Sequence, residues 1–93
     1  MPSSLPPPVA SLVGREVVLD VAGPYIFLGR LTGGDDKFLA LEDADVHDLR
    51  DTATTREEYV IAARRHGVAP NRLRVYVRTA DVVSLSALED VIA

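Results

Sequence analysis

The chain contains neither cysteine nor tryptophan in its 93 residues. Because cysteine is absent, the sequence excludes a disulfide framework and any zinc site built on thiolates. No apolar run approaches the roughly 20 residues that a membrane-spanning helix requires, and the N-terminus lacks the basic-then-apolar pattern of a signal peptide. We therefore expect a soluble, cytoplasmic protein with no membrane partner.

The chain has fewer basic residues than acidic ones, 10 against 14, and its net charge is -4. A negative total argues against non-specific electrostatic binding to nucleic acid. The signs are nevertheless segregated: seven acidic residues fall between Asp35 and Asp51, and seven basic ones between Arg50 and Arg78. An acidic face and a basic face can therefore coexist, although a mixed solvated surface explains the same charges.

The organisation along the chain predicts a tail followed by one domain. Residues 1–8 form a Ser/Pro tail that we expect to be flexible, because the consecutive prolines Pro6–Pro8 favour extended polyproline. Residues 9–93 are expected to form a single domain, which opens with a short helical turn over Val9–Val13.

Alternation of apolar and polar residues predicts five short strands. Gly29 lies in the middle of the second strand, where a missing side chain lets a strand bend sharply. The pattern therefore favours a mainly β fold, a small and strongly bent antiparallel barrel. The expected strands are Arg15–Val21, Pro24–Thr32, Lys37–Glu42, Arg72–Arg78 and Asp81–Leu85.

A helical insert of about residues 45–71 is expected between the third and fourth strands. Either of two pairs, Thr54 with Glu57 or Thr55 with Glu58, fits a capping box that begins a helix of about three turns. The apolar side of this helix carries Tyr59, Val60 and Ile61, which are expected to lie either on the barrel or on a partner.

Two stretches carry the most informative motif, YIFLGRLTGGDDKFLALEDAD from Tyr25 and VYVRTADVVSLS from Val75. Together they resemble the two-part signature of the Sm-like (LSm/Hfq-like) family. The first part is matched by Gly29, Leu31, Asp36, Leu39, Leu41 and Asp43, and the second by Arg78-Thr79-Ala80 and Val82-Val83.

The turn Asp36-Lys37-Phe38 is closest to the bacterial, Hfq-like form of this motif. Phe38 stands where the eukaryotic and archaeal form places an asparagine that binds a uracil edge. The chain therefore resembles a divergent bacterial member of the family that carries a helical insert.

The resemblance implies a ring-forming protein that binds single-stranded RNA, with no DNA expected, on a surface of loops beside a pore. The residues that it assigns to RNA are Asp36, Lys37, Phe38, Arg78 and Thr79. The Phe38 ring would stack on a base while the cations hold phosphates. In the alternative interpretation, Phe38 packs on a neighbouring subunit and Lys37 is only a solvated turn residue.

The resemblance also implies a homo-oligomer of six or seven subunits, in which the fourth strand of one chain pairs with the fifth strand of the next. The apolar residues expected at that seam are Val75, Val77, Val82 and Leu85. A second hypothesis is a structural or regulatory homo-oligomer that binds a protein partner through the insert helix, without RNA.

Other clusters of polar residues support weaker interpretations. The acidic group Asp43, Asp45, His47, Asp48 and Asp51 fits no metal-binding spacing, so neither a metal nor a cofactor is expected. No catalytic residues are expected either, because His47 and His66 have no nucleophile motif to activate. A second basic patch could include Arg56, Arg64, Arg65, Arg72 and Arg74, unless nearby acids such as Asp43, Asp45 and Asp48 pair with them.

Overall fold

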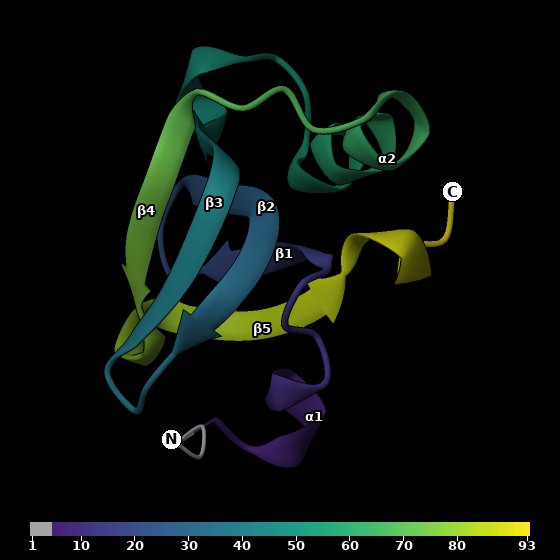
Figure 1. Cartoon of the computed structure of the whole chain (residues 1–93). Coiled ribbons are helices and arrows are strands. Elements are labelled where there is room, and N and C mark those ends of the chain that lie inside the picture. The colour runs from purple at the N-terminus through teal and green to yellow at the C-terminus, as the bar shows by residue number, and fades with distance from the viewer. Residues whose placement is uncertain (1–4) are drawn as a thin grey trace.

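The computed structural model describes residues 5–93, so the first four residues of the expected tail lie outside it. Five strands form one antiparallel sheet in the order β4-β3-β2-β1-β5, which curves around a core (Figure 1). The predicted mainly β fold is therefore confirmed. The strands are β1 (Glu16–Val21), β2 (Tyr25–Gly34), β3 (Phe38–Asp48), β4 (Arg72–Arg78) and β5 (Val82–Ala87).

Within residues 5–93, two helices and three short 3-10 turns complete the fold. They are α1 (Pro7–Ala10), α2 (Arg56–His66), η1 (Leu49–Asp51), η2 (Thr79–Asp81) and η3 (Leu88–Asp90). Among residues 5–93, no helix is long and apolar enough to cross a lipid bilayer. The expectation of extended polyproline up to Pro8 is wrong, because Pro7 and Pro8 begin α1. Proline is accepted there, since the first N–H groups of a helix have no acceptor within it.

The sheet buries both of its faces along β1. Val17 and Leu19 point into the inner core, as the alternation predicts, and both are fully buried. Val18 lies on the opposite side, which alternation along the strand predicts to face solvent, yet it is also buried with 1% exposure. It belongs to a second apolar cluster, whose other buried members are Ile26, Leu28, Val60, Ala63 and Leu88.

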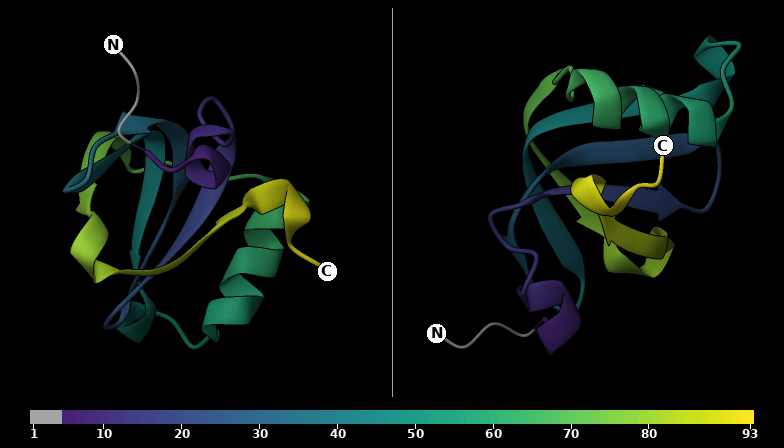
Figure 2. Two further views of the ribbon diagram at one scale, coloured as in Figure 1. Left: turned by 90° about the horizontal axis from the view of Figure 1, so that it is seen from below. Right: turned by 90° about the vertical axis from the view of Figure 1, so that its right-hand side faces the viewer.

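This second cluster shows where the insert helix lies. Val60 and Ala63 of α2 pack with side chains of β1 and β2 and with Leu88 of η3, so α2 covers part of the outer face of the sheet (Figure 2). The capping box uses Thr55 and Glu58, one of the two predicted pairs. The apolar side of the helix was expected to lie either on the barrel or on a partner. It packs on the barrel of its own chain.

Gly29 allows β2 and β3 to approach closely where the sheet bends. A Cβ atom at this position would lie 3.0 Å from Cα of Ala44 and 3.1 Å from the carbonyl oxygen of Glu42. The pairing register between β2 and β3 shifts at the same place, and Asp43 opposite takes a positive φ of 47°. These features describe a β-bulge, which increases local twist and bends the strand.

The third strand continues to Asp48 rather than ending at Glu42. Its second half reads as a loop in the sequence because it is polar and acidic. In the structure, the side chains of Asp45 and His47 both contact Tyr59 of α2. The segment inserted between β3 and β4 is therefore residues 49–71.

The fourth strand has the predicted bounds, but one of its inward positions is not buried. Alternation along Arg72–Arg78 predicts that Leu73 and Val77 share the inward face, yet Val77 is only 4% exposed and Leu73 is 86% exposed. β4 lies at one end of the strand order and β5 at the other. Leu73 therefore lies on a strand that has a neighbour on one side only. β5 extends to Ala87, beyond the predicted end of the fifth strand at Leu85.

Candidate functional site

The turn between β2 and β3 meets the junction between β4 and β5. Phe38 pairs with Arg78 in the β3–β4 ladder. The backbone N–H of Thr79 donates to the carbonyl oxygen of Lys37 at 2.8 Å, and the Thr79 hydroxyl donates to that of Asp36 at 2.7 Å. The five residues predicted for RNA therefore lie together. With Ala80, they line a hollow of about 260 Å³: Asp36, Lys37, Phe38, Arg78 and Thr79.

Asp35, which the sequence did not assign to the site, holds the β2–β3 turn in shape. Its carboxylate accepts hydrogen bonds from the backbone N–H groups of Lys37 and Phe38, both at 2.8 Å. The bond from Phe38, followed by that from Lys37, lowers the pKa of Asp35 below its ordinary value. Aspartate side chains in turns commonly accept a hydrogen bond from the backbone N–H two residues ahead. This tendency is the sequence signal that could have identified Asp35.

The hollow combines an aromatic face with charges of both signs. Phe38 is 44% exposed, and its neighbour Lys37 forms no ion pair with any residue of 5–93. Arg78 lies 3.5 Å from the carboxylate of Asp81, an exposed pair. Exposed ion pairs are weak, so Arg78 can exchange this partner for a phosphate. A ring beside two cations is suited to stacking a base and holding the backbone next to it.

The residues predicted for the subunit seam lie mostly inside the barrel. Val77 belongs to the core, and Val75, Val82 and Leu85 pack partly buried against it. Within the described chain, β4 pairs only with β3 and β5 only with β1, so each has one unpaired edge. The large apolar side chains exposed on these two strands include Leu73 and Val83.

The acidic residues after Glu42 are engaged in local contacts. Asp43 lies 2.9 Å from Arg30, and Asp48 lies 2.7 Å from Arg50. Hydrogen bonds from the Arg50 side chain and backbone lower the pKa of Asp48 to about 2. No group of three or more potential metal ligands comes together anywhere in residues 5–93.

Asp45 is held in a polar contact between β3 and α2. The hydroxyl of Tyr59 donates to its carboxylate, which is buried at 6% residue exposure. The Tyr59 ring stacks on His47, with centroids 4.0 Å apart and planes 8° apart. Burial, followed by the bond to Asp45, raises the pKa of Tyr59 above its ordinary value. These contacts attach α2 to the sheet.

The arginines of the predicted basic patch do not act together, because those that are paired contact different parts of the chain. Arg56 donates to the carbonyl oxygens of Gly23 and Tyr25 and lies 3.4 Å from Asp20. Arg74 lies 3.7 Å from Glu42, an acid that was not expected as its partner. The remaining members, Arg64, Arg65 and Arg72, are exposed.

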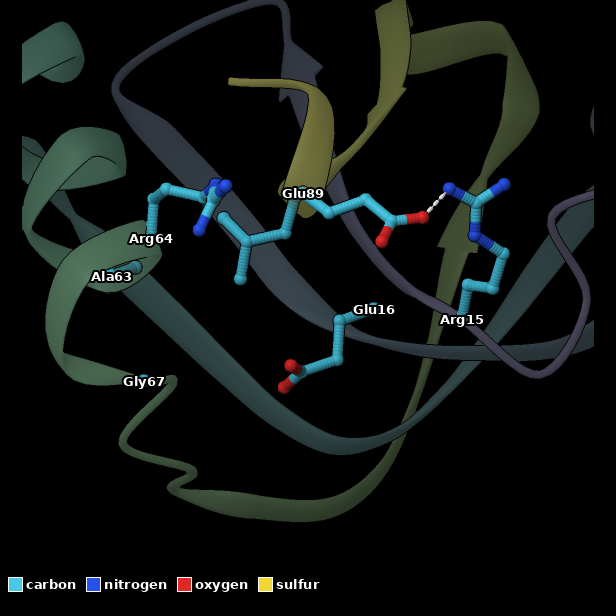
Figure 3. A pocket seen from close by; sticks show the side chains of 7 residues that line it. Arg15, Glu16, Ala63, Arg64, Gly67 and Glu89 are labelled. Atoms are coloured by element: carbon cyan, nitrogen blue, oxygen red, sulfur yellow. Dashed lines mark ion pairs between the residues drawn. The ribbon is translucent and has the colours of Figure 1, made fainter. Parts of the chain in front are cut away.

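A larger hollow of about 330 Å³ lies between α2, the start of β1 and η3 (Figure 3). Arg15 and Glu89 form an ion pair on one side of it, while Arg64 of α2 lies on the opposite side and Glu16 below. Two cations and two anions balance each other there. This hollow therefore lacks the combination of exposed aromatic ring and cations found at the β2–β3 turn.

Comparisons with known proteins support the fold. Neither a protein-family model nor a curated protein matches the sequence. A solved structure of the Sm protein of Pyrococcus abyssii in complex with a uridine heptamer is similar to this chain, with a TM-score of 0.60 and 17% sequence identity. The alignment covers 89% of this chain and 99% of that one. The chain therefore has an Sm-like fold.

Proposed function

We propose that this chain with an Sm-like fold binds single-stranded RNA through the hollow at the β2–β3 turn. The observation that carries the proposal is the meeting of Lys37, Phe38 and Arg78 on two loops joined by hydrogen bonds. Phe38 offers a stacking face, while Lys37 and Arg78 supply charge for phosphates. The RNA-bound Sm protein of similar fold adds support to this proposal.

The proposal includes assembly into a closed homo-oligomer, with six or seven subunits expected. The outer edges of β4 and β5 each carry unpaired backbone groups, and pairing one with the other on the next chain would satisfy both. Leu73 and Val83 add exposed apolar surface to these strands. In such a ring the turns of successive subunits would repeat around one opening.

The alternative, a protein partner bound through the insert helix, has less support. Val60 and Ala63 on the apolar side of α2 are already buried on the barrel, and Tyr59 is engaged with Asp45. The remaining side of the helix is mostly charged and exposed. RNA binding is therefore the function that the geometry favours.

The test replaces Phe38 with alanine and measures binding of a fluorescein-labelled uridine heptamer by anisotropy. Loss of one stacked base should weaken binding by about 1–3 kcal/mol per site, with no change in the mass of the assembly. Val13→Ala is a control of similar exposure, because Val13 is 43% exposed and Phe38 44%.

A steep fall in native affinity with rising salt is also expected, since phosphate contacts release counterions. Unchanged affinity in the Phe38→Ala variant would reject the site. Failure of the native assembly to bind RNA at all would reject the function.

A further inference from the structure

The side of α2 that faces away from the barrel carries a symmetric arrangement of side chains. Glu57, Ile61 and Arg65 follow one another at intervals of four residues, so they form one stripe along the helix. Val60 and Ala63, which pack on the barrel, lie on a different side. An acid, an apolar residue and a base therefore line the outward side of α2 in that order.

This stripe has no partner within residues 5–93. Glu57 and Arg65 are both exposed, and neither forms an ion pair there. Ile61 is half-buried, yet it packs against neither of the two apolar clusters of the fold. The helix dipole accounts for an acid in the first turn and a base in the last, but not for an isoleucine between them on the outward side.

The other ionisable side chains of α2 are directed toward their own chain. Arg56 donates to the turn between β1 and β2, and Glu58 closes the capping box. Arg64 lines the hollow of Figure 3 together with two acids from β1 and η3, and His66 lines a smaller hollow with Asp45. The outward stripe therefore carries one acid and one base, whose charges cancel.

We propose that α2 binds α2 of a second copy of this chain, with the two helices antiparallel. A two-fold axis beside Ile61 would bring Glu57 of each helix opposite Arg65 of the other, because both are four residues from Ile61. The stripe is thus complementary to itself, as a two-fold contact requires. Ala62, exposed beside Ile61, is small enough to let the two helices approach closely.

The position of α2 in the fold is compatible with this contact. The helix lies at the end of the barrel opposite to α1 and to the β2–β3 turn (Figures 1 and 2). Two copies joined through α2 would therefore leave the hollow at the β2–β3 turn on the outside of the pair. The inference adds a contact between copies to the proposed function and does not depend on RNA.

A single contact of this kind should be weak. α2 has 11 residues, which makes it about 16 Å long at a rise of 1.5 Å per residue, so it buries less surface than a stable interface needs. Two closed assemblies meeting face to face would make about six or seven such contacts at once, and multivalency would strengthen them together. Because exposed ion pairs are screened by salt, the pairing should weaken as salt rises.

The first experiment exchanges the charges and measures mass by light scattering at low salt, without RNA. Glu57→Arg places like charges opposite each other, so the mass should fall to about half of the native value. Glu57→Arg/Arg65→Glu restores the complementarity and should recover the native mass. Asp90→Arg is the control, because it makes the same charge change at an exposed position of η3. Circular dichroism checks that each variant retains α2.

The second experiment uses the absence of cysteine from the chain. Ile61→Cys places one thiol beside the two-fold axis, within reach of the same thiol on the second copy. Mild oxidation should therefore produce a cross-linked dimer on a non-reducing gel. Ser11→Cys is the control, since Ser11 is exposed directly after α1, at the opposite end of the barrel, and should cross-link much less.

The outcomes separate this inference from the proposed function. A native mass of about six or seven chains that Glu57→Arg leaves unchanged would overturn the helix pairing, and α2 would then be free for a different protein. Failure of the charge-exchanged variant to recover the native mass, or equal cross-linking of Ile61→Cys and Ser11→Cys, would overturn it as well.

Other results would reject the proposed function alone. A native mass of two chains that falls to one in Glu57→Arg would support the helix pairing and reject the closed assembly. Failure of the native protein to bind RNA would leave the pairing intact, because neither experiment contains RNA. A native mass of one chain would reject both the pairing and the assembly.

Discussion

At the scale of single residues, the pair Tyr59 and Asp45 should contribute strongly to stability. Replacing Tyr59 with phenylalanine leaves the buried carboxylate of Asp45 without its donor, with only Asn71 at 3.5 Å remaining. An unsatisfied buried polar group costs about 1–3 kcal/mol. We expect urea unfolding to show a loss of that size for Tyr59→Phe, and almost none for Tyr76→Phe on the exposed face of β4.

The same tyrosine should make stability depend on alkaline pH. Burial and the bond to Asp45 raise the pKa of Tyr59 above its ordinary value of 10, so the folded state keeps a proton that the unfolded state loses. This contribution is fully present below pH 10 and is lost as pH rises through the higher folded-state value. Tyr59→Phe should lack this component of the alkaline decline, and an identical decline in the variant would contradict the assignment.

Gly29 is the residue on which the bend of the sheet most directly depends. Its φ is not positive, so the constraint is one of space: a Cβ atom would meet Ala44 and the carbonyl oxygen of Glu42. Gly29→Ala should therefore destabilise the fold by about 1–3 kcal/mol, the usual range for overpacking. Thermal unfolding measures it, and Gly29→Ala/Ala44→Gly should recover part of the loss because one of the close contacts disappears.

At the scale of elements, the start of α2 tests the capping assignment. Only the pair Thr55 and Glu58 forms the reciprocal hydrogen bonds. Thr55→Ala should cost about 1 kcal/mol of stability, while Thr54→Ala, one residue earlier, should cost much less. Circular dichroism with urea unfolding compares the two, and equal losses would contradict the observed cap.

The strands that the sequence predicted well are those whose pattern is determined locally. β4 has its predicted bounds because alternation and flanking turns define it. The polar second half of β3 could not be recognised, since Asp45 and His47 are accommodated by Tyr59 of a helix distant in sequence. The burial of Val18 was missed for the same reason, because α2 covers a face that the strand alone would leave exposed.

The candidate site shows the same division between local and distant contacts. Motif positions correctly placed Lys37, Phe38 and Arg78 together, because a turn and a strand junction recur at fixed positions in the fold. The hydrogen bonds from Thr79 that join the two loops were not predictable. They depend on the spacing of the two loops in the folded sheet, which no short sequence window contains.

At the scale of the whole molecule, the two unpaired edges determine how the proposed assembly can be tested. Leu73 is 86% exposed on β4 and Val83 is 74% exposed on β5. Lysine at either position should oppose strand pairing between chains, because charges on edge strands discourage it. Light scattering should show a smaller mass for Leu73→Lys and Val83→Lys.

A control for this prediction lies outside the sheet. Ile92 is 92% exposed and follows the last strand, so Ile92→Lys adds the same charge without touching either edge. Its mass should equal that of the native protein. A native mass corresponding to one chain would reject the proposed assembly directly.

The free edges of β4 and β5 are different from each other, so a variant can lose one edge and keep the other. Such a variant could be mixed with the native protein. In an assembly built through these edges, every incomplete row of subunits still offers one edge of each kind until it closes. A subunit with only one functional edge would join a row and prevent its closure. A minority of such subunits would therefore inhibit the native majority out of proportion to its abundance, as a dominant-negative variant does.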